Sequence, residues 1–255
     1  MTASLERLSQ QLATFFERQV QPGARLAVGY SGGLDSSVLL HLLAGLRASF
    51  PFSLTAVHVH HGLSPDADAW ALHCTRVCAA LDVPLETHRV EVRRAGDGLE
   101  AAARAARYRV YAQLDAEYVV LAQHRDDQAE TVLLQLLRGA SLKGLAAMPK
   151  MRPLRNDMAL LRPFLDVTRA EIAACAAACG LVWVEDASNA DLRLARNALR
   201  HEVMPVLSAC FPDSAKALAQ AAVHFAETVP LLDALAEADA SAAISGAGLA
   251  VSVLH

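Results

Sequence analysis

The sequence predicts an α/β fold with a doubly wound, mostly parallel sheet, followed by a small helical region. Short apolar runs alternate with longer helix-like stretches from Arg25 to Arg138, which is the pattern of successive βαβ units. Apolar residues make up 54% of the 255 residues and charged residues 20%, which excludes a disordered chain. Aromatic residues are scarce while Ala and Leu are abundant, so the protein is expected to be rich in helix.

The chain opens with an amphipathic helix, because Leu5, Leu8 and Leu12 recur at helical spacing until Pro22 ends the pattern. Four apolar runs then predict strands, and the stretches between them predict crossover helices. The strands are expected at 25–30, 54–59, 85–92 and 118–122, and the helices at 36–43, 68–81, 99–114 and 126–138. Right-handed crossovers place the carboxyl ends of these strands, and the loops after them, along one edge of the sheet.

The pattern changes after Pro149. Thr168 and Glu171 have the spacing of a capping box, which predicts a helix running to Gly180. A short strand at 182–184 and an Ala-rich helix at 213–243 are expected next. Residues 249–255 alternate like a strand that has no turn or cap, which suggests a truncated chain.

Composition narrows the class of protein. No apolar run reaches the ~18–20 residues of a membrane span, and the N-terminus lacks a signal-peptide core, so a cytoplasmic protein without a membrane partner is expected. Five cysteines exclude a complete disulfide framework, and we interpret those in apolar stretches as buried thiols. The net charge of −4 does not by itself indicate a nucleic-acid partner.

The loop SGGLDSS follows the first expected strand and precedes a helix. Its two glycines allow close backbone approach, and backbone N–H groups at a helix N-terminus bind anions. The hydroxyls add donors, and Asp35 is suited to holding a magnesium ion on bound phosphates. A simple Gly-rich turn with capping residues is the alternative. The sequence GxxxxGK of a Walker loop and the GxGxxG of dinucleotide folds are both absent.

A second polar motif, QHRDDQAET, follows the fourth expected strand and therefore lies at the same edge. On a helix starting at Asp126, the carboxylates of Asp126, Asp127 and Glu130 share one face. Capping by acidic residues is the simpler interpretation. Three carboxylates in five residues exceed what a cap needs, so a magnesium or ammonium site is also expected.

The SGGLDS loop resembles the pyrophosphate loop of the N-type ATP pyrophosphatases, the PP-loop superfamily with an adenine nucleotide alpha-hydrolase-like fold. Longer matches resemble the tRNA(Ile)-lysidine synthase family over roughly residues 25 to 205. They are VGYSGGLDSSVLL (28–40), VHVHHGLSPDADAW (57–70), GLEAAARAARY (98–108), AQHRDDQAETVLLQLLRGASLKGLAAM (122–148), LLRPFL (160–165) and EDASNADLRLARNALR (185–200).

This resemblance implies a two-step ligase reaction that uses ATP and Mg²⁺. The wobble cytidine of a tRNA(Ile) with a CAU anticodon is adenylated, and free L-lysine then displaces AMP to give lysidine. The resemblance also implies a catalytic domain over residues 1–212. Residues 213–255 would form a helical linker and the start of a truncated C-terminal substrate-binding region. Whether two copies form a homodimer is left open.

Site residues are assigned by motif position. ATP binding is expected from the loop and one nearby histidine: Ser31, Gly32, Gly33, Leu34, Asp35, Ser36, Ser37 and His58. Catalytic roles are expected for Asp35, Asp127, Glu130, Arg196 and Arg200, with Asp35 and Asp127 as magnesium ligands. Candidates for contact with tRNA or lysine are Arg104, Arg107, His124, Asp126 and Asn197.

Simpler interpretations remain open for several of these residues. His124 is equally a packing histidine, and Arg104 with Arg107 is equally a solvated stripe. His58, His60 and His61 suggest zinc only weakly, because no carboxylate or Cys spacing matches. From spacing alone, Arg193, Arg196 and Arg200 form a basic helix face suited to phosphates.

Two departures from the family pattern and two rival functions bear on this hypothesis. Leu194 stands where the family often has Tyr, and Glu202 where a basic residue is common, which would reduce tRNA contacts.

A tRNA thiolase would need reactive cysteines near the site, and here they lie in apolar stretches away from the two loops. A non-catalytic nucleotide-binding module is disfavoured by intact Asp35, Asp127 and Glu130.

Overall fold

The computed structural model describes residues 3–92, 98–245 and 248–249 of the chain. They form two compact units. Unit 1 consists of residues 1–125 and 150–190, and unit 2 of residues 126–149 and 191–255. The boundary expected after residue 212 falls inside unit 2, between α9 (Met204–Cys210) and α10 (Ser214–Ala243).

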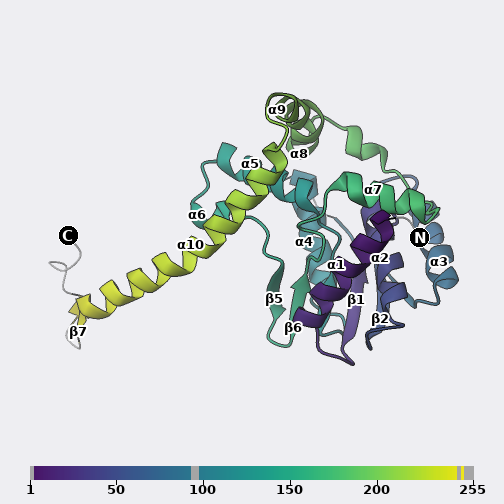
Figure 1. Cartoon of the computed structure of the whole chain (residues 1–255), viewed down its shortest axis with the longest axis horizontal. Helices are drawn as coiled ribbons and strands as arrows, with labels where there is room; N and C mark the ends of the chain where they lie inside the picture. The colour runs from purple at the N-terminus through teal and green to yellow at the C-terminus, as the bar shows by residue number, and fades with distance from the viewer. Residues whose placement is uncertain (1–2, 93–97, 246–247, 250–255) are drawn as a thin grey trace. The chain divides into compact units, whose positions relative to one another are not determined.

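Unit 1 is built on a six-stranded sheet, which confirms the predicted fold class (Figure 1). In sheet order the strands are β3 (Leu85–Arg89), β2 (Ser53–His60), β1 (Arg25–Gly29), β4 (Tyr118–Val120), β6 (Met158–Leu161) and β5 (Met151–Arg155). Five strands are parallel, and only β5 runs antiparallel, against β6. The four expected strands are confirmed, whereas the hairpin of β5 and β6 was not predicted.

Helices cover both faces of this sheet. They are α1 (Ala3–Gln19), α2 (Leu34–Leu46), α3 (Ala67–Ala80), α4 (Gly98–Tyr111) and α7 (Arg169–Ala178), with a short 3-10 turn at Ala187–Ala190. Two hydrophobic cores lie on opposite faces of the sheet, and alternate residues of β1 point into each. Leu26 and Val28 pack with α1, α2, α3 and α7, while Ala27 packs with the end of α4. This alternation follows from the two-residue period of a strand.

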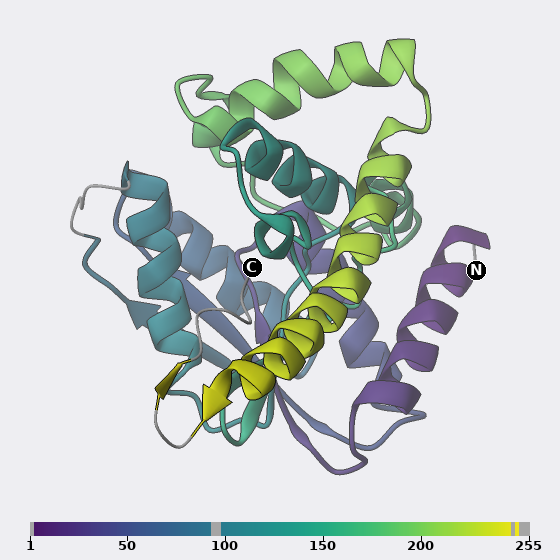
Figure 2. The same cartoon turned by 90° about the vertical axis from the view of Figure 1, so that its left-hand side faces the viewer.

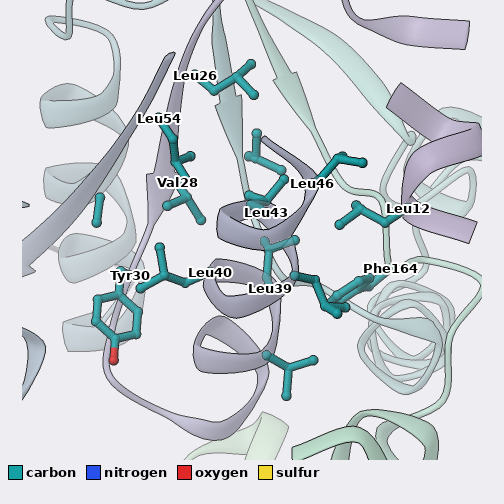
Figure 3. Packing of buried hydrophobic residues seen from close by; sticks show 14 of the residues in the cluster. Leu12, Leu26, Val28, Tyr30, Leu39, Leu40, Leu43, Leu46, Leu54 and Phe164 are labelled. Atoms are coloured by element: carbon teal, nitrogen blue, oxygen red, sulfur yellow. The ribbon is translucent and has the colours of Figure 1, made fainter. Parts of the chain in front are cut away.

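The larger core is centred on α2, whose Leu39, Leu40 and Leu43 are fully buried (Figure 3). Each such side chain contributes roughly 1.5–3 kcal/mol by leaving water. In Figure 3 Leu40 lies beside Val28, close to Tyr30. The position of α2, and of the loop before it, is therefore fixed by packing along most of the helix.

The chain after β6 shows one confirmed and one wrong prediction. Thr168 forms the expected capping box, since its hydroxyl accepts from the Glu171 N–H at 3.1 Å and the Glu171 carboxylate accepts from the Thr168 N–H at 2.8 Å. The strand expected at 182–184 does not form. Val184 donates a backbone hydrogen bond to the Gly32 carbonyl instead, at 2.9 Å, so this segment lies against the loop rather than in the sheet.

Unit 2 is helical. Its elements are α5 (Arg125–Leu137), whose first residue belongs to unit 1, α6 (Leu142–Leu145), α8 (Ala195–Ala198), a π-helical turn (Leu199–Val203), α9 and α10. The Gln128 side chain donates to and accepts from the backbone of Met148, at 2.9 and 3.0 Å, which joins α5 to the segment after α6. Figure 2 shows α10 as one continuous helix, although Pro230 lies inside it.

The C-terminal strand prediction is only partly described. Ile244–Ser245 pairs antiparallel with Gly248–Leu249, and residues 250–255 lie outside the described residues. Within the described part of the chain, no helix is long and apolar enough to cross a membrane.

Candidate active site

The phosphate loop, residues 31–37, leads from β1 into α2 as predicted. Gly32 has a φ of +84°, which glycine adopts without strain, and Gly33 precedes the helix. The hydroxyls of Ser31 and Ser36 lie 3.0 Å apart, and that of Ser36 donates to the Gly33 carbonyl at 3.0 Å. The hydroxyls therefore hold the loop in shape, while the N–H groups at the start of α2 have no carbonyl of their own helix to bond.

Gly32 also lies in close contact with its surroundings. A Cβ at this position would lie 3.1 Å from Cys74 Sγ and 3.1 Å from Val184 Cγ2. We therefore expect Gly32→Ala to distort the loop, lowering stability by ~1–3 kcal/mol and weakening ATP binding at least ~10-fold (about 1.4 kcal/mol). Calorimetric titration with ATP and thermal unfolding measure both effects.

Gly23→Ala is the matched control for this prediction. Gly23 has nearly the same φ, +85°, but nothing lies within 4 Å of its added Cβ, and it belongs to the turn after α1. This variant should show the backbone strain with unchanged ATP affinity. Equal loss of ATP binding in both variants would show that the Gly32 effect is general destabilisation.

Asp35 lies in the first turn of α2, beside two cationic or titratable side chains of unit 1. Its carboxylate is 3.8 Å from His124 Nε2 and 3.4 Å from Arg169 Nη1. The side chain of Asp35 is 28% exposed, whereas that of His124 is 1% exposed. Asp35 thus remains accessible to a ligand, while His124 is a buried residue that lines the loop. Arg169 was not predicted, because it is 134 residues away in sequence.

The three histidines of the second strand region are neighbours, and the ring centres of His58 and His60 lie 6.5 Å apart. His58 is buried, and its Nδ1 lies 3.0 Å from the Tyr30 carbonyl and 3.5 Å from Cys74 Sγ. Burial lowers the pKa of His58, and burial with the nearby Arg107 charge lowers the pKa of His61 to about 4. His60 Nε2 lies 3.1 Å from Asp68 Oδ1. Among the described residues, no group of three His, Cys, Asp or Glu side chains is arranged to hold a metal ion.

The cysteines are buried less uniformly than expected. Cys74, Cys78 and Cys175 are buried, Cys179 is half-buried and Cys210 is exposed. The expectation that the cysteines lie away from both loops was wrong for Cys74, which is adjacent to Gly32. Burial raises the pKa of Cys74 to about 12, so its thiol stays protonated at neutral pH.

Unit 2 holds a carboxylate–arginine cluster made of Asp127, Glu130, Arg196 and Arg200. Helix α5 presents the two carboxylates on one face, while the arginines come from α8 and the π-helical turn. Arg200 Nε donates to Glu130 Oε1 at 2.6 Å, and Arg196 Nε donates to Glu130 Oε2 at 2.9 Å. Both arginines also donate to Asp127 Oδ1, at 3.0 and 3.1 Å.

This cluster is electrically balanced and only partly open to solvent. The side chain of Glu130 is 3% exposed and that of Asp127 is 15% exposed, while each arginine is about a quarter exposed. Asp127 is therefore the more accessible carboxylate. Any cation that binds here competes with a guanidinium already in place. Asp126 is half-buried on the same helix, and Asn197 is buried, where its amide donates to the Asp191 carbonyl at 3.1 Å.

Arg104 and Arg107 lie on α4, as expected, but in different surroundings. Arg104 contacts the ring of Tyr108 and donates to its hydroxyl at 3.2 Å. Arg107 is close enough to His61 to affect its titration. The sequence reasoning missed Tyr108 and the buried Arg162 that joins it at 3.3 Å. The motif EAAARAARY contained the signal for Tyr108, because it lies one turn after Arg104.

Comparison with known proteins identifies the family of the chain. The PP-loop domain model matches residues 4–207. The tRNA(Ile)-lysidine synthase of Azoarcus is 52% identical over 225 residues, covering 88% of this chain and 50% of the relative. That of Chromobacterium violaceum is 50% identical over 224 residues, covering 87% of this chain and 52% of the relative. The chain thus spans about half the length of these curated relatives.

A solved structure shows the same fold. The U34-tRNA thiolase NcsA from Methanococcus maripaludis, with its iron–sulfur (4Fe-4S) cluster, has a TM-score of 0.70 and 16% identity, over 88% of this chain and 80% of that one. At this identity the likeness concerns the fold alone. Because the PP-loop domain model matches most of the sequence, including the loop between β1 and α2, the chain belongs to the PP-loop domain family.

Proposed function

We propose that the chain is the catalytic part of a tRNA(Ile)-lysidine synthase. The observation that supports this most directly is the identity of about 50% to synthases of that name over 87–88% of the chain. An alignment that covers 87–88% of 255 residues necessarily includes the phosphate loop from Asp35 onward and the whole carboxylate–arginine cluster. The substrates would be ATP, free L-lysine and a tRNA(Ile) with a CAU anticodon, in the cytoplasm; a homodimer stays a prediction.

In the first step the phosphate loop binds the ATP phosphates, and the substrate's ring oxygen attacks the α-phosphorus, releasing pyrophosphate. The N–H groups at the start of α2 are the donors available for phosphate oxygens. The Ser31 and Ser36 hydroxyls contact each other at 3.0 Å, and that of Ser36 donates to the Gly33 carbonyl, so their predicted role as phosphate donors requires these bonds to be exchanged. Ser37, whose hydroxyl donates to the Gly32 carbonyl at 3.4 Å, keeps the loop in place. Adenylation converts a poor leaving oxygen into AMP.

Magnesium fits Asp35 better than Asp127. Asp35 is partly exposed beside the loop, and Mg²⁺ in nucleotide sites binds through one or two carboxylates together with the phosphates. Asp127 Oδ1 already accepts from two guanidiniums, so its predicted role as a second magnesium ligand requires their displacement. When bound, the metal would neutralise charge on the departing pyrophosphate.

In the second step the lysine ε-amine attacks the activated ring carbon and AMP departs. The amine attacks only when neutral, so a residue must bind the ammonium and accept its proton. Asp127 is the more accessible carboxylate for this task, while Glu130 is enclosed by guanidiniums. Arg196 and Arg200 hold both carboxylates in place.

A tRNA thiolase is the alternative function within the same superfamily, and the cysteines distinguish it from the synthase. Sulfur transfer needs an accessible thiolate near the nucleotide. Cys74 is the cysteine adjacent to the loop, and burial raises its pKa to about 12. The chemistry of this thiol therefore favours the synthase over the thiolase.

AMP formation with each substrate omitted in turn tests the proposal. With Mg²⁺, ATP, lysine and a tRNA(Ile) bearing CAU, we expect AMP and pyrophosphate in equal amounts. AMP formation should need that RNA and should fail with the same RNA bearing CAU→UAU at the wobble position. Equal AMP formation with both RNAs would contradict the assignment, and ATP binding with no AMP under any condition would favour a non-catalytic module.

A further inference from the structure

Unit 1 contains a second charged cluster that the proposed reaction does not use. The arginine–tyrosine cluster consists of Arg104, Tyr108, Arg152 and Arg162. The guanidinium carbons of Arg104 and Arg152 lie 4.9 and 5.1 Å from the centre of the Tyr108 ring. The Tyr108 hydroxyl accepts from Arg104 at 3.2 Å and from Arg162 at 3.3 Å. One side chain thus gathers three guanidiniums from α4, β5 and the segment after β6.

The topology places this cluster at the ligand-binding edge of the sheet. Arg162 directly follows the carboxyl end of β6, and it donates to Gln123, which follows β4, at 3.1 Å. Arg152 pairs with Leu160 near the same end of β6. The sheet order runs β1, β4, β6, and the carboxyl end of β1 leads into the phosphate loop. Only β4 separates β6 from β1, so the cluster lies at the same edge of the sheet as that loop.

The cluster brings together three arginine charges, although the net charge of the chain is −4. Arg162 is only 2% exposed, and burying an ion costs several kcal/mol unless hydrogen bonds replace its lost hydration, which here come from Gln123 and Tyr108. In the part of the chain that the structure describes, no carboxylate forms an ion pair with Arg104 or Arg152. Burial raises the pKa of Tyr108, yet Arg104, Arg162 and Arg152 together bring this pKa below its ordinary value.

We propose that the arginine–tyrosine cluster binds backbone phosphates of the RNA substrate, with Arg104 and Arg152 as the contacting residues and Arg162 as a positioning residue. Arg104 is exposed and Arg152 half-exposed, so both can reach a ligand. A guanidinium forms two parallel hydrogen bonds to a phosphate group. Because contact with the tyrosine ring already restricts these arginine side chains, they lose little conformational entropy when they bind. The inference rests on the proposed function, since it identifies where that function's RNA would be held.

Binding of an RNA hairpin with a CAU loop tests this surface. Its affinity would be measured by fluorescence anisotropy at several salt concentrations, with ATP affinity measured separately. We expect R152Q to weaken RNA binding ~3–10-fold, and R104Q/R152Q at least ~10-fold, near 0.1 M salt. The slope of log affinity against log salt should fall by about one for each arginine removed. ATP affinity should stay within about twofold of the wild-type value.

R109Q is the matched control, because Arg109 is exposed on α4 and its removal changes the net charge equally. It should leave RNA affinity unchanged. The proposal is overturned if R104Q/R152Q binds RNA normally, or if R109Q loses as much RNA affinity. It is also overturned if the wild type does not bind the hairpin, or if the variants lose ATP affinity but not RNA affinity. If the variants behave as expected but the wild type attaches no lysine, the surface stands and the proposed reaction fails.

Discussion

Asp35→Ala is expected to abolish AMP formation, lowering its rate by ~10³-fold or more, which corresponds to about 4 kcal/mol of transition-state stabilisation. The side chain is 28% exposed at the start of α2, beside the phosphate loop, and we propose that its carboxylate holds magnesium on the ATP phosphates. Removing it should leave the fold intact, because loss of an acidic residue from a first turn costs only about 0.3–1 kcal/mol. A coupled AMP assay and circular dichroism measure the two quantities.

Glu100→Ala is the appropriate control for that experiment. Glu100 also lies in the first turn of a helix, α4, and is exposed. Its removal should leave AMP formation unchanged. AMP formation at the wild-type rate by Asp35→Ala would show that the phosphate-loop assignment is wrong.

Glu130→Gln should have the second largest effect. Both Glu130 oxygens accept from guanidiniums, with three hydrogen bonds of 2.6 to 2.9 Å. Glutamine replaces one of these acceptors by a donor, which leaves guanidinium groups facing an N–H. Breaking one side of a largely buried ion pair typically costs ~3 kcal/mol or more. We expect a loss of that order in the free energy of unfolding, and lysine incorporation lowered at least ~10-fold at every lysine concentration.

The exposed Glu227→Gln on α10 provides the comparison within unit 2. It should change neither stability nor incorporation. Assays at a temperature where Glu130→Gln is fully folded separate the two effects. Incorporation by folded Glu130→Gln that matched the wild type across lysine concentrations would remove Glu130 from the site.

The main sheet could be predicted because its strands are short apolar runs separated by helix-length stretches. The β5 strand could not, since Met151–Arg155 contains Pro153 and two arginines and reads as a loop. Proline is tolerated there because β5 is an edge strand. Conversely, the apolar run at 182–184 pairs with no strand among the described residues, and the Val184 N–H donates to the Gly32 carbonyl instead.

The sequence predicted the candidate site residues within each motif, but not which motifs contact one another. The loop 31–37 and the acidic motif at 126–130 were found because each is compact in sequence. Their partners were not fixed by spacing: Arg196 and Arg200 pair with carboxylates 66 to 73 residues earlier. The three arginines around Tyr108 come from separate elements. Such pairs depend on the tertiary fold, which local periodicity does not specify.

Nucleoside analysis of the RNA product tests the central claim most directly. A tRNA(Ile) bearing CAU would be incubated with the protein, ATP, Mg²⁺ and isotopically labelled lysine, then digested to nucleosides and examined by mass spectrometry. The proposed function predicts that the wobble cytidine gains one lysine with loss of one water, and that the isotope label follows it. An unmodified cytidine in RNA whose ATP had been converted to AMP, or a cytidine with sulfur in place of oxygen, would contradict it.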